Sequence, residues 1–294
     1  DEFDLERVNR GDLSPVFFGS ALTNFGVETF LKHFLKMTSS PLPRESGDDI
    51  VDPFDPRFSA FVFKIQANMN KAHRDRIAFM RICSGKFTAG MEVYHVQGKK
   101  PLRLSQPQQL MAQDRKIIDE AYAGDIIGVF DPGIFSIGDT LTASPAHKVQ
   151  FPAIPTFAPE HFAKVRQIDT MKRKQFVKGV MQIAQEGAIQ IFQEFNTGME
   201  EIIVGVVGVL QFEVLEYRLK SEYNVEIRLD MLPYEHIRWI ENENYDVAQI
   251  VGTSDMKRIK DLKDRPLLLF VNAWSVNMVL DRNPGLKLSE FGTE

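Results

Sequence analysis

The side chains best suited to chemistry in this sequence are basic residues, which gather in three short segments. They are Lys71, His73, Arg74 and Arg76; Lys99, Lys100 and Arg103; and Lys172, Arg173 and Lys174. Lys and Arg are the usual contacts to nucleic-acid phosphates. The third segment opens an expected helix, where cations oppose the helix dipole at a cost of up to about 1 kcal/mol, and a bound phosphate would offset that cost. For any one cluster the ordinary alternative is a solvated surface.

Nucleotide-binding motifs are the second kind of chemistry to consider. No phosphate-binding loop of the form G-x-x-x-x-G-K-[ST] occurs in the sequence. Residues 70–73 (NKAH) begin like the guanine-reading motif N-K-x-D, and residues 125–128 (DIIG) match D-x-x-G. Because no phosphate loop precedes them, we expect both strings to be ordinary loop and strand residues.

Metal binding and covalent catalysis have little support in the sequence. The six histidines include no pair at the spacing that places two imidazoles on one helix face, so we expect no metal site. Cys83 lies in a β-type segment and is expected to be buried rather than nucleophilic. Glu200 and Glu201 resemble exposed loop carboxylates, and no G-x-S-x-G motif is present. We therefore expect no catalytic residue in this chain, which disfavours a free-standing enzyme.

The elements that position these residues begin with residues 1–40. Residues 15–22 form a nearly continuous apolar run, which predicts a strand buried on both faces. Thr23 and Asn24 are suitable N-cap residues for a helix whose apolar stripe is Val27, Phe30, Leu31, Phe34 and Leu35. One strand and one helix cannot enclose a core, so this region is expected to be the last βα unit of an α/β domain. Residues 41–57, which are polar and rich in Pro, predict a linker.

Residues 58–150 predict a small β-barrel. Short β-type segments at 61–66, 77–83, 91–96, 125–129 and 140–142 alternate with glycine-containing turns. The fold class expected of the whole chain is mainly β plus α+β.

Residues 151–294 predict a ferredoxin-like domain with a C-terminal extension. Expected strands at 163–168, 188–195, 202–206 and 225–229 and helices at 171–186 and 209–223 give the order βαββαβ. Phe176, Val180, Ile183 and Ala184 are expected to face the core from the first helix, and Leu210, Val214 and Leu219 from the second. Beyond Pro233 we expect strands at 237–240 and 267–272 and a helix at 275–282, which together form an appendage.

Composition places the chain among folded globular proteins. Its 294 residues suit two domains, 44% are hydrophobic, and the net charge of −5 provides no overall basic field for nucleic acid. The single cysteine fits a reducing cytoplasm, and no apolar run is long enough to span a membrane. The N-terminus, Asp-Glu-Phe-Asp, lacks Met and resembles a cut inside a longer chain rather than a signal peptide.

Three segments together resemble the bacterial peptide chain release factor 3 family, a group of translational GTPases related to elongation factor G. They are GSAL at residues 19–22, FVFKIQANMNKAHRDRIAFMRICSG at 61–85 and GVVGVLQFEVLEYRLKSEYNVE at 205–226. The first string is too short to be specific, whereas the other two are long. The resemblance covers nearly the whole chain from about Leu13 and is weakest after Pro233. It implies a G domain, then a translation-factor barrel, then a ferredoxin-like domain.

The resemblance also implies a nucleotide site of which this chain holds a small part. Ser20, Ala21 and Leu22 would be the fifth G motif, whose backbone N–H groups contact guanine. The phosphate loop, the Mg²⁺-holding switch, D-x-x-G and N-K-x-D would all precede Asp1. Since phosphoryl transfer needs phosphates, metal and water positioned together, this chain alone is expected to bind no cofactor, while a full-length parent would use GTP or GDP and Mg²⁺.

The implied partner is the ribosome. The barrel would contact small-subunit RNA and the third domain would lie near the protein at the decoding centre, so that a codon-reading release factor is affected only indirectly. Lys71, His73, Arg74 and Arg76, and then Lys172, Arg173 and Lys174, are the candidate RNA contacts. We expect a cytoplasmic monomer without membrane association. A module of another translational GTPase, such as elongation factor G, and a nucleotide-independent RNA-binding protein remain alternatives.

Overall fold

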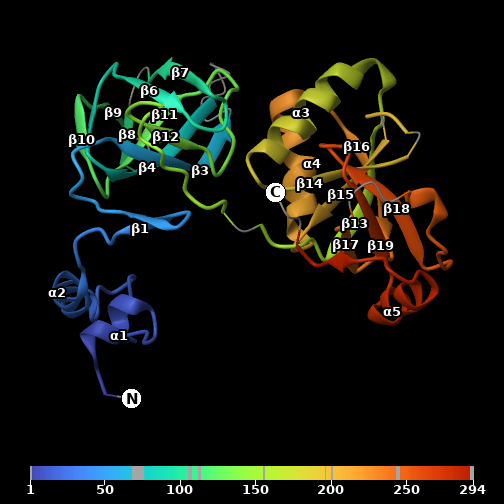
Figure 1. Ribbon diagram of the computed structural model, residues 1–294, viewed down its shortest axis with the longest axis horizontal. Helices are drawn as coiled ribbons and strands as arrows, with labels where there is room; N and C mark the ends of the chain where they lie inside the picture. The colour runs from blue at the N-terminus through green and yellow to red at the C-terminus, as the bar shows by residue number, and fades with distance from the viewer. Residues whose placement is uncertain are drawn as a thin grey trace.

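The computed structural model describes residues 2–67, 76–104, 108–111, 114–154, 156–195, 197–199, 201–242 and 246–291. Figure 1 shows a small helical unit at the N-terminus, a rolled β-sheet next to it, and a larger α/β part that contains the C-terminal half of the chain. No helix within these residues has the length and apolar character needed to cross a membrane.

The N-terminal unit contains two helices, α1 (Leu5–Arg10) and α2 (Val27–Met37). The strand expected at 15–22 is wrong, since the only pairing described there is an isolated bridge between Ser20 and Phe25. An apolar run becomes a strand only beside a partner strand, and no described strand lies next to this one. The expected caps Thr23 and Asn24 are also wrong, because Gly26, in the left-handed conformation, caps α2.

The expected linker contains a hairpin of β1 (Arg44–Ser46) and β2 (Asp49–Val51). The hairpin packs on the barrel, since Val51 is buried there and the Arg44 guanidinium lies 3.9 Å from the centre of the Phe61 ring. Ser46 Oγ also exchanges hydrogen bonds with the backbone of Gln150. The β1–β2 hairpin is therefore packed against the barrel.

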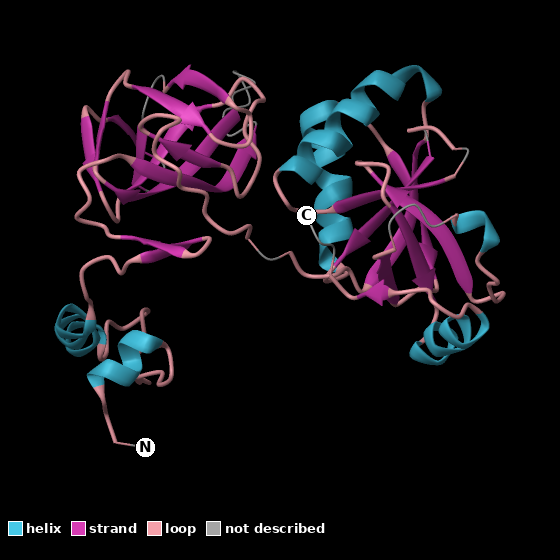
Figure 2. Cartoon of the chain, viewed as in Figure 1, coloured by secondary structure: helices cyan, strands magenta, loops and turns pink. Residues whose placement is uncertain are grey.

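The middle of the chain forms an eight-stranded antiparallel sheet that rolls into a half-barrel, as Figure 2 shows. The strand order is β7-β6-β12-β3-β4-β11-β8-β9, and β5 and β10 form a separate pair. The strands are β3 (Ser59–Ala67), β4 (Arg76–Ser84), β5 (Lys86–Thr88), β6 (Glu92–His95), β7 (Lys100–Arg103), β8 (Gln108–Met111), β9 (Asp114–Ile117), β10 (Glu120–Tyr122), β11 (Ile126–Phe130) and β12 (Thr140–Thr142). All five expected segments correspond to strands here. The core includes Val62, Met80, Ile82 and Ile127.

The last part begins with four strands and two helices in the order β13-α3-β14-β15-α4-β16. Their bounds are β13 (His161–Gln167), α3 (Arg173–Gln185), β14 (Gln190–Glu194), β15 (Glu201–Val206), α4 (Leu210–Tyr223) and β16 (Ile227–Leu232), with a 3₁₀ turn, η1 (Thr170–Lys172), before α3. Both helices pack on one face of the sheet, where Phe176 of α3 and Leu215 of α4 meet Val165 and Ile202. The expected inward positions Leu210 and Val214 are wrong, since both are exposed and Phe212, Leu215 and Leu219 face the core instead.

The C-terminal segment continues the same sheet. Its elements are β17 (His236–Ile240), η2 (Val247–Gln249), β18 (Met256–Asp261), β19 (Pro266–Phe270), α5 (Ala273–Arg282) and β20 (Leu288–Ser289). Because β18 pairs with β14, the sheet order becomes β16-β13-β15-β14-β18-β19-β17-β20. Ile237 and Leu269 pack on Phe162 and Ile203, so these strands cover the face opposite α3 and α4. The expected appendage is therefore an integral part of this sheet.

Candidate nucleic-acid interface

The loop of Ser20, Ala21 and Leu22 is an exposed turn. Ser20 N–H donates to the Phe25 carbonyl at 2.9 Å, whereas the N–H groups of Ala21 and Leu22 have no hydrogen-bond partner among the described residues. Two glycines make the turn possible, because a Cβ on Gly19 would lie 2.9 Å from the Phe25 carbonyl oxygen and one on Gly26 would lie 2.5 Å from that of Phe18. The turn thus presents two free backbone donors to solvent.

The first basic cluster lies mostly outside the described residues. Lys71, His73 and Arg74 lie outside the described residues, and Arg76 is the member of the cluster that the structure describes. The Arg76 side chain is 11% exposed, and its Nε donates to the fully buried Asp131 at 2.6 Å. Its Nη2 donates to the Phe135 carbonyl at 2.9 Å and its Nη1 donates to Gln185 Oε1. Arg76 is thus engaged within the protein, and its predicted RNA contact would require these bonds to open.

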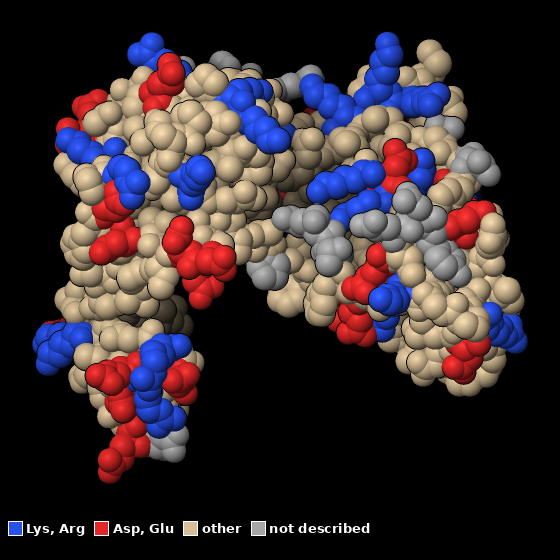
Figure 3. All heavy atoms as spheres, viewed as in Figure 1, with Lys and Arg blue, Asp and Glu red and all other residues tan. Residues whose placement is uncertain are grey.

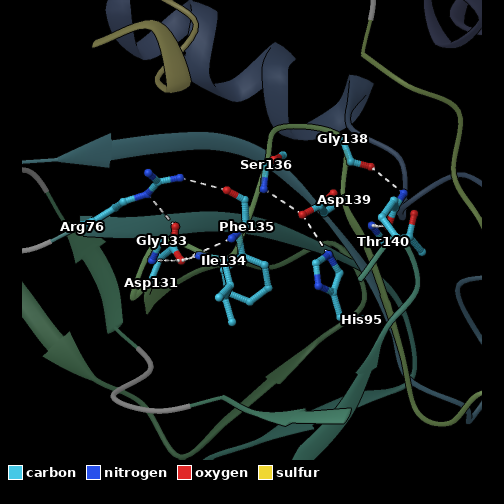
Figure 4. Close-up of polar contacts among 11 residues, drawn as sticks. Arg76, His95, Asp131, Gly133, Ile134, Phe135, Ser136, Gly138, Asp139 and Thr140 are labelled. Atoms are coloured by element: carbon cyan, nitrogen blue, oxygen red, sulfur yellow. Dashed lines mark hydrogen bonds and ion pairs between the residues drawn. The ribbon is translucent and has the colours of Figure 1, made fainter. Parts of the chain in front are cut away.

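Arg76 connects the half-barrel to α3. Figure 4 shows its guanidinium between Asp131 and Phe135 of the loop that follows β11, while Gln185 is the last residue of α3. A cleft of about 560 Å³ beside this contact is lined by Arg76, Phe130 and Pro132 from the barrel side and by Lys178 and Met181 from α3. One charged side chain therefore links two parts that are distant in sequence.

Two buried aspartates shape the same loop. Asp131 Oδ1 accepts hydrogen bonds from the Gly133 and Ile134 N–H groups at 2.8 Å each. Asp139 Oδ2 accepts from the Ser136 N–H at 2.7 Å and lies 2.9 Å from His95 Nε2, as Figure 4 shows. Sequence reasoning missed this network, although the turn-forming triplet Asp131-Pro132-Gly133 could have indicated the loop. Its bonds are internal, so its role is to hold the loop that carries Phe135.

The second cluster lies at one edge of the half-barrel. Lys99 has a positive φ of 50° in the turn before β7, and Lys100 begins that strand. Arg103 Nε donates to the Gly90 carbonyl at 2.8 Å. Lys99 and Lys100 are exposed, so this cluster matches an ordinary solvated edge.

The third cluster opens α3. Lys172 closes η1, while Arg173 and Lys174 occupy the first turn of α3, which contains no acidic residue. Asp169 caps the 3₁₀ turn through its bond to the Met171 N–H. Within the described residues Lys172 and Lys174 make no ion pair, although Lys172 helps to lower the pKa of Glu226 after the larger effect of the Lys220 hydrogen bond. Figure 3 shows Lys and Arg side chains gathered along the upper edge of the part that carries α3.

The remaining reactive groups have structural surroundings. Cys83 is buried beside Phe61, and burial raises the pKa of its thiol to about 11, which confirms the expected core position. The described residues contain no group of three or more His, Cys, Asp or Glu that could hold a metal ion.

Comparisons with known proteins agree with this arrangement. Residues 151–280 match the family model described as class II release factor RF3, C-terminal domain, and residues 57–144 match that of elongation factor G domain 2. A crystal structure of a protein from Thermus thermophilus, 20% identical, superposes with a TM-score of 0.60 over 82% of this chain and 36% of that chain. At that identity the likeness concerns the fold alone.

Curated relatives are considerably closer in sequence. Peptide chain release factor 3 of Symbiobacterium thermophilum is 59% identical over 97% of this chain and 54% of that protein. The proteins of the same name from Listeria monocytogenes (strain HCC23) and Nostoc punctiforme are each 47% identical, over 99% and 98% of this chain and 55% and 53% of their own lengths. The chain thus spans about half the length of the curated relatives it matches. On these matches, the chain belongs to the peptide chain release factor 3 family.

Proposed function

We propose that this chain is the ribosome-docking part of a translation-termination GTPase that promotes recycling of the codon-reading release factor after peptide release. Family membership supports the role in termination. The observation that carries the docking role is the run Lys172, Arg173 and Lys174 at the start of α3, where no carboxylate of the first turn balances the helix dipole. An RNA phosphate would supply the missing negative charge.

The proposed contacts divide between the two large parts of the molecule. The half-barrel lies against small-subunit RNA through Lys71, His73 and Arg74, whose assignment rests on sequence alone. The α/β part that begins with β13 lies near the protein of the decoding centre. Arg76 is better assigned to joining the half-barrel to α3, because its donors already have protein partners. The protein acts as a monomer in the cytoplasm.

The nucleotide site of the proposed GTPase is only partly represented here. Ala21 and Leu22 fit a guanine-binding role, because their N–H groups are free of partners among the described residues, whereas Ser20 N–H is already bonded to Phe25. No phosphate-binding loop is present among the 294 residues. We therefore assign phosphate and Mg²⁺ binding to residues outside this chain, and expect the chain alone neither to hold nor to hydrolyse GTP. When bound, GTP would supply the γ-phosphoryl group that is transferred to water, with GDP as the leaving group.

Cosedimentation with purified ribosomes across a salt series tests the docking role. The double variant Lys172→Glu with Lys174→Glu is expected to bind more weakly, because two phosphate contacts are lost. The slope of log K against log salt should become shallower by about 1.5, since each contact to RNA contributes roughly 0.7 to 0.9.

A matched control separates local contacts from net charge. Lys36→Glu with Lys287→Glu changes the net charge equally at two exposed positions on α2 and before β20. The control should keep the wild-type slope. If the two double variants have the same slope, or if the wild-type chain fails to cosediment at low salt, the docking role of the α3 cluster, Lys172, Arg173 and Lys174, is wrong.

A further inference from the structure

The outer face of α4 carries exposed apolar side chains at helical spacing. Leu210, Val214 and Tyr217 are 67%, 50% and 68% exposed, and their spacing of four and then three residues places them on one side of the helix. Val207 and Val209, in the turn before α4, are also exposed. We call Val207, Leu210, Val214 and Tyr217 the α4 stripe.

The α4 stripe is not needed by its own domain. Phe212, Leu215 and Leu219, on the opposite side of α4, already fill the core between the helix and the sheet. A helix in a folded domain usually buries one apolar stripe and exposes polar residues elsewhere, so a second stripe requires a different explanation.

The turn that begins α4 holds the stripe in a fixed orientation. Gln211 Oε1 accepts hydrogen bonds from the N–H groups of Val207 and Gly208, at 2.9 and 3.1 Å. Its Nε2 donates to the carbonyl of Ala188, just after α3, at 3.0 Å. The outward direction of Val207 and Leu210 is therefore anchored to the rest of the domain, so a partner would meet a preformed surface.

The charges around the stripe select the kind of partner. Glu213 and Glu216 are exposed on α4 and make no ion pair within the described residues. The two cations of α4 are already occupied, since Arg218 bonds to Glu186 and Glu222 and Lys220 bonds to Glu226. This surface repels phosphate and favours apolar residues accompanied by Lys or Arg.

We infer that the α4 stripe is a docking site for an amphipathic, basic segment of a partner protein. Leucine-type side chains of the partner would cover Leu210, Val214 and Tyr217, while its Lys or Arg residues would pair with Glu213 and Glu216. This surface is distinct from the RNA-phosphate contacts at the start of α3 and does not depend on them.

Fluorescence anisotropy with a labelled peptide tests the inference directly. The probe is a helix of about 14 residues, long enough for four turns, made of Leu and Lys with Leu on one face, and it is titrated with the 294-residue chain. Leu210→Gln with Val214→Gln is expected to weaken binding by at least about tenfold, because apolar anchors at the centre of an interface dominate affinity. Glu213→Lys with Glu216→Lys should weaken it as well, and should strengthen binding of a Leu and Glu peptide of the same pattern.

The matched control is another exposed apolar helix face of the chain. Leu31 and Leu35 of α2 are 49% and 74% exposed, so Leu31→Gln with Leu35→Gln removes a similar area elsewhere. These changes should leave peptide affinity unchanged. Equal losses for the α2 and α4 variants, or no loss for the α4 variants, would overturn the inference.

Two further outcomes also count against a protein partner of this kind. Sedimentation of the chain alone could show a dimer that Leu210→Gln with Val214→Gln dissolves, which would make a second copy the occupant. A labelled oligouridine that loses affinity in the same variant would make RNA the occupant. Because Leu210 and Val214 are exposed, circular dichroism should show that the Leu210→Gln with Val214→Gln variant is folded. The Glu213→Lys with Glu216→Lys variant tests the same site without removing apolar area.

Discussion

The two helices α3 and α4 lie antiparallel on the same face of one sheet, yet their outer surfaces have opposite character. Gln211 near the start of α4 bonds beside the end of α3, and Tyr223 at its end bonds back to Gln182. The first turn of α4 contains Glu213, which suits the helix dipole, whereas α3 opens with three cations, which do not.

In a domain that is otherwise regular, these two outer surfaces are where a ligand or partner is to be sought. Elements that satisfy every local rule need only the fold to explain them, and a departure from such a rule is a place to look for a ligand. On α3 the broken rule is electrostatic and favours an anion. On α4 it is hydrophobic, because an apolar stripe faces solvent beside carboxylates that make no described ion pair, and it favours a basic protein segment.

The two surfaces keep a fixed position relative to each other only if α3 and α4 form one rigid unit, and Arg218 provides the strongest test of that rigidity. Its guanidinium bonds to Glu186 at the end of α3 and to Glu222 within α4, and all three side chains are largely buried. Arg218→Ala takes the guanidinium away from two largely buried carboxylates, so it should lower the free energy of unfolding by about 3 to 5 kcal/mol. Urea denaturation measures the loss.

Arg228→Ala is the control for Arg218→Ala. Arg228 pairs with Asp230 on the surface of the same sheet, and breaking such an exposed pair costs less than about 1 kcal/mol. If both variants lose equal stability, the Arg218 network does not hold α3 to α4, and the two surfaces cannot be treated as fixed relative to each other.

Adjacent residues of α4 provide the next test, because they separate the core side from the stripe. Leu215 is fully buried, so Leu215→Ala should cost about 2 to 5 kcal/mol through lost contacts and the cavity left behind. Val214→Ala, one position away and half exposed, should change stability by no more than about 0.5 kcal/mol. Thermal and urea unfolding of both variants measure the contrast. A large cost for Val214→Ala would show that the stripe stabilises the domain itself.

The orientation of α4 also shows what the sequence could not predict. Its apolar residues occupy two faces, so periodicity identified a helix at 209–223 but could not choose which side is buried, and Leu210 and Val214 were assigned to the wrong one. Leu219 was placed correctly. The choice depends on which residues the neighbouring strands accommodate, which is tertiary information.

Other misses have similar physical causes. The strand expected at 15–22 lacks a described neighbour with which to pair. The strand β18 (MKRIKD) escaped notice because four of its six residues are charged and its two apolar ones, Met256 and Ile259, are three positions apart rather than two. Strands with long apolar or alternating runs, such as β3, β4 and β15, were found. At the site, charge clusters on one chain segment were visible in the sequence, whereas the ion pair of Arg76 with Asp131 joins residues 55 positions apart, and spacing alone cannot predict it.

The smallest expected effect concerns Glu226, the carboxylate close to the α3 cluster. A hydrogen bond from Lys220 lowers the pKa of Glu226, with a further contribution from Lys172, so at neutral pH it is ionised and partly offsets the cations. Glu226→Gln should therefore raise affinity for ribosomes at low salt, by less than Lys172→Glu with Lys174→Glu lowers it.

Glu6→Gln removes the same charge from the exposed first turn of α1, in the N-terminal unit, and it should leave ribosome affinity unchanged. The direction in which the pKa of Glu226 shifts also predicts how stability and ribosome binding change with pH. Because the folded-state pKa of Glu226 is lowered, its pairing stabilises the protein above the unfolded pKa, and this contribution disappears as pH falls through the folded pKa. Protonation there should act on binding as Glu226→Gln does. Equal effects of Glu226→Gln and Glu6→Gln would mean that net charge, rather than the start of α3, attracts the phosphates.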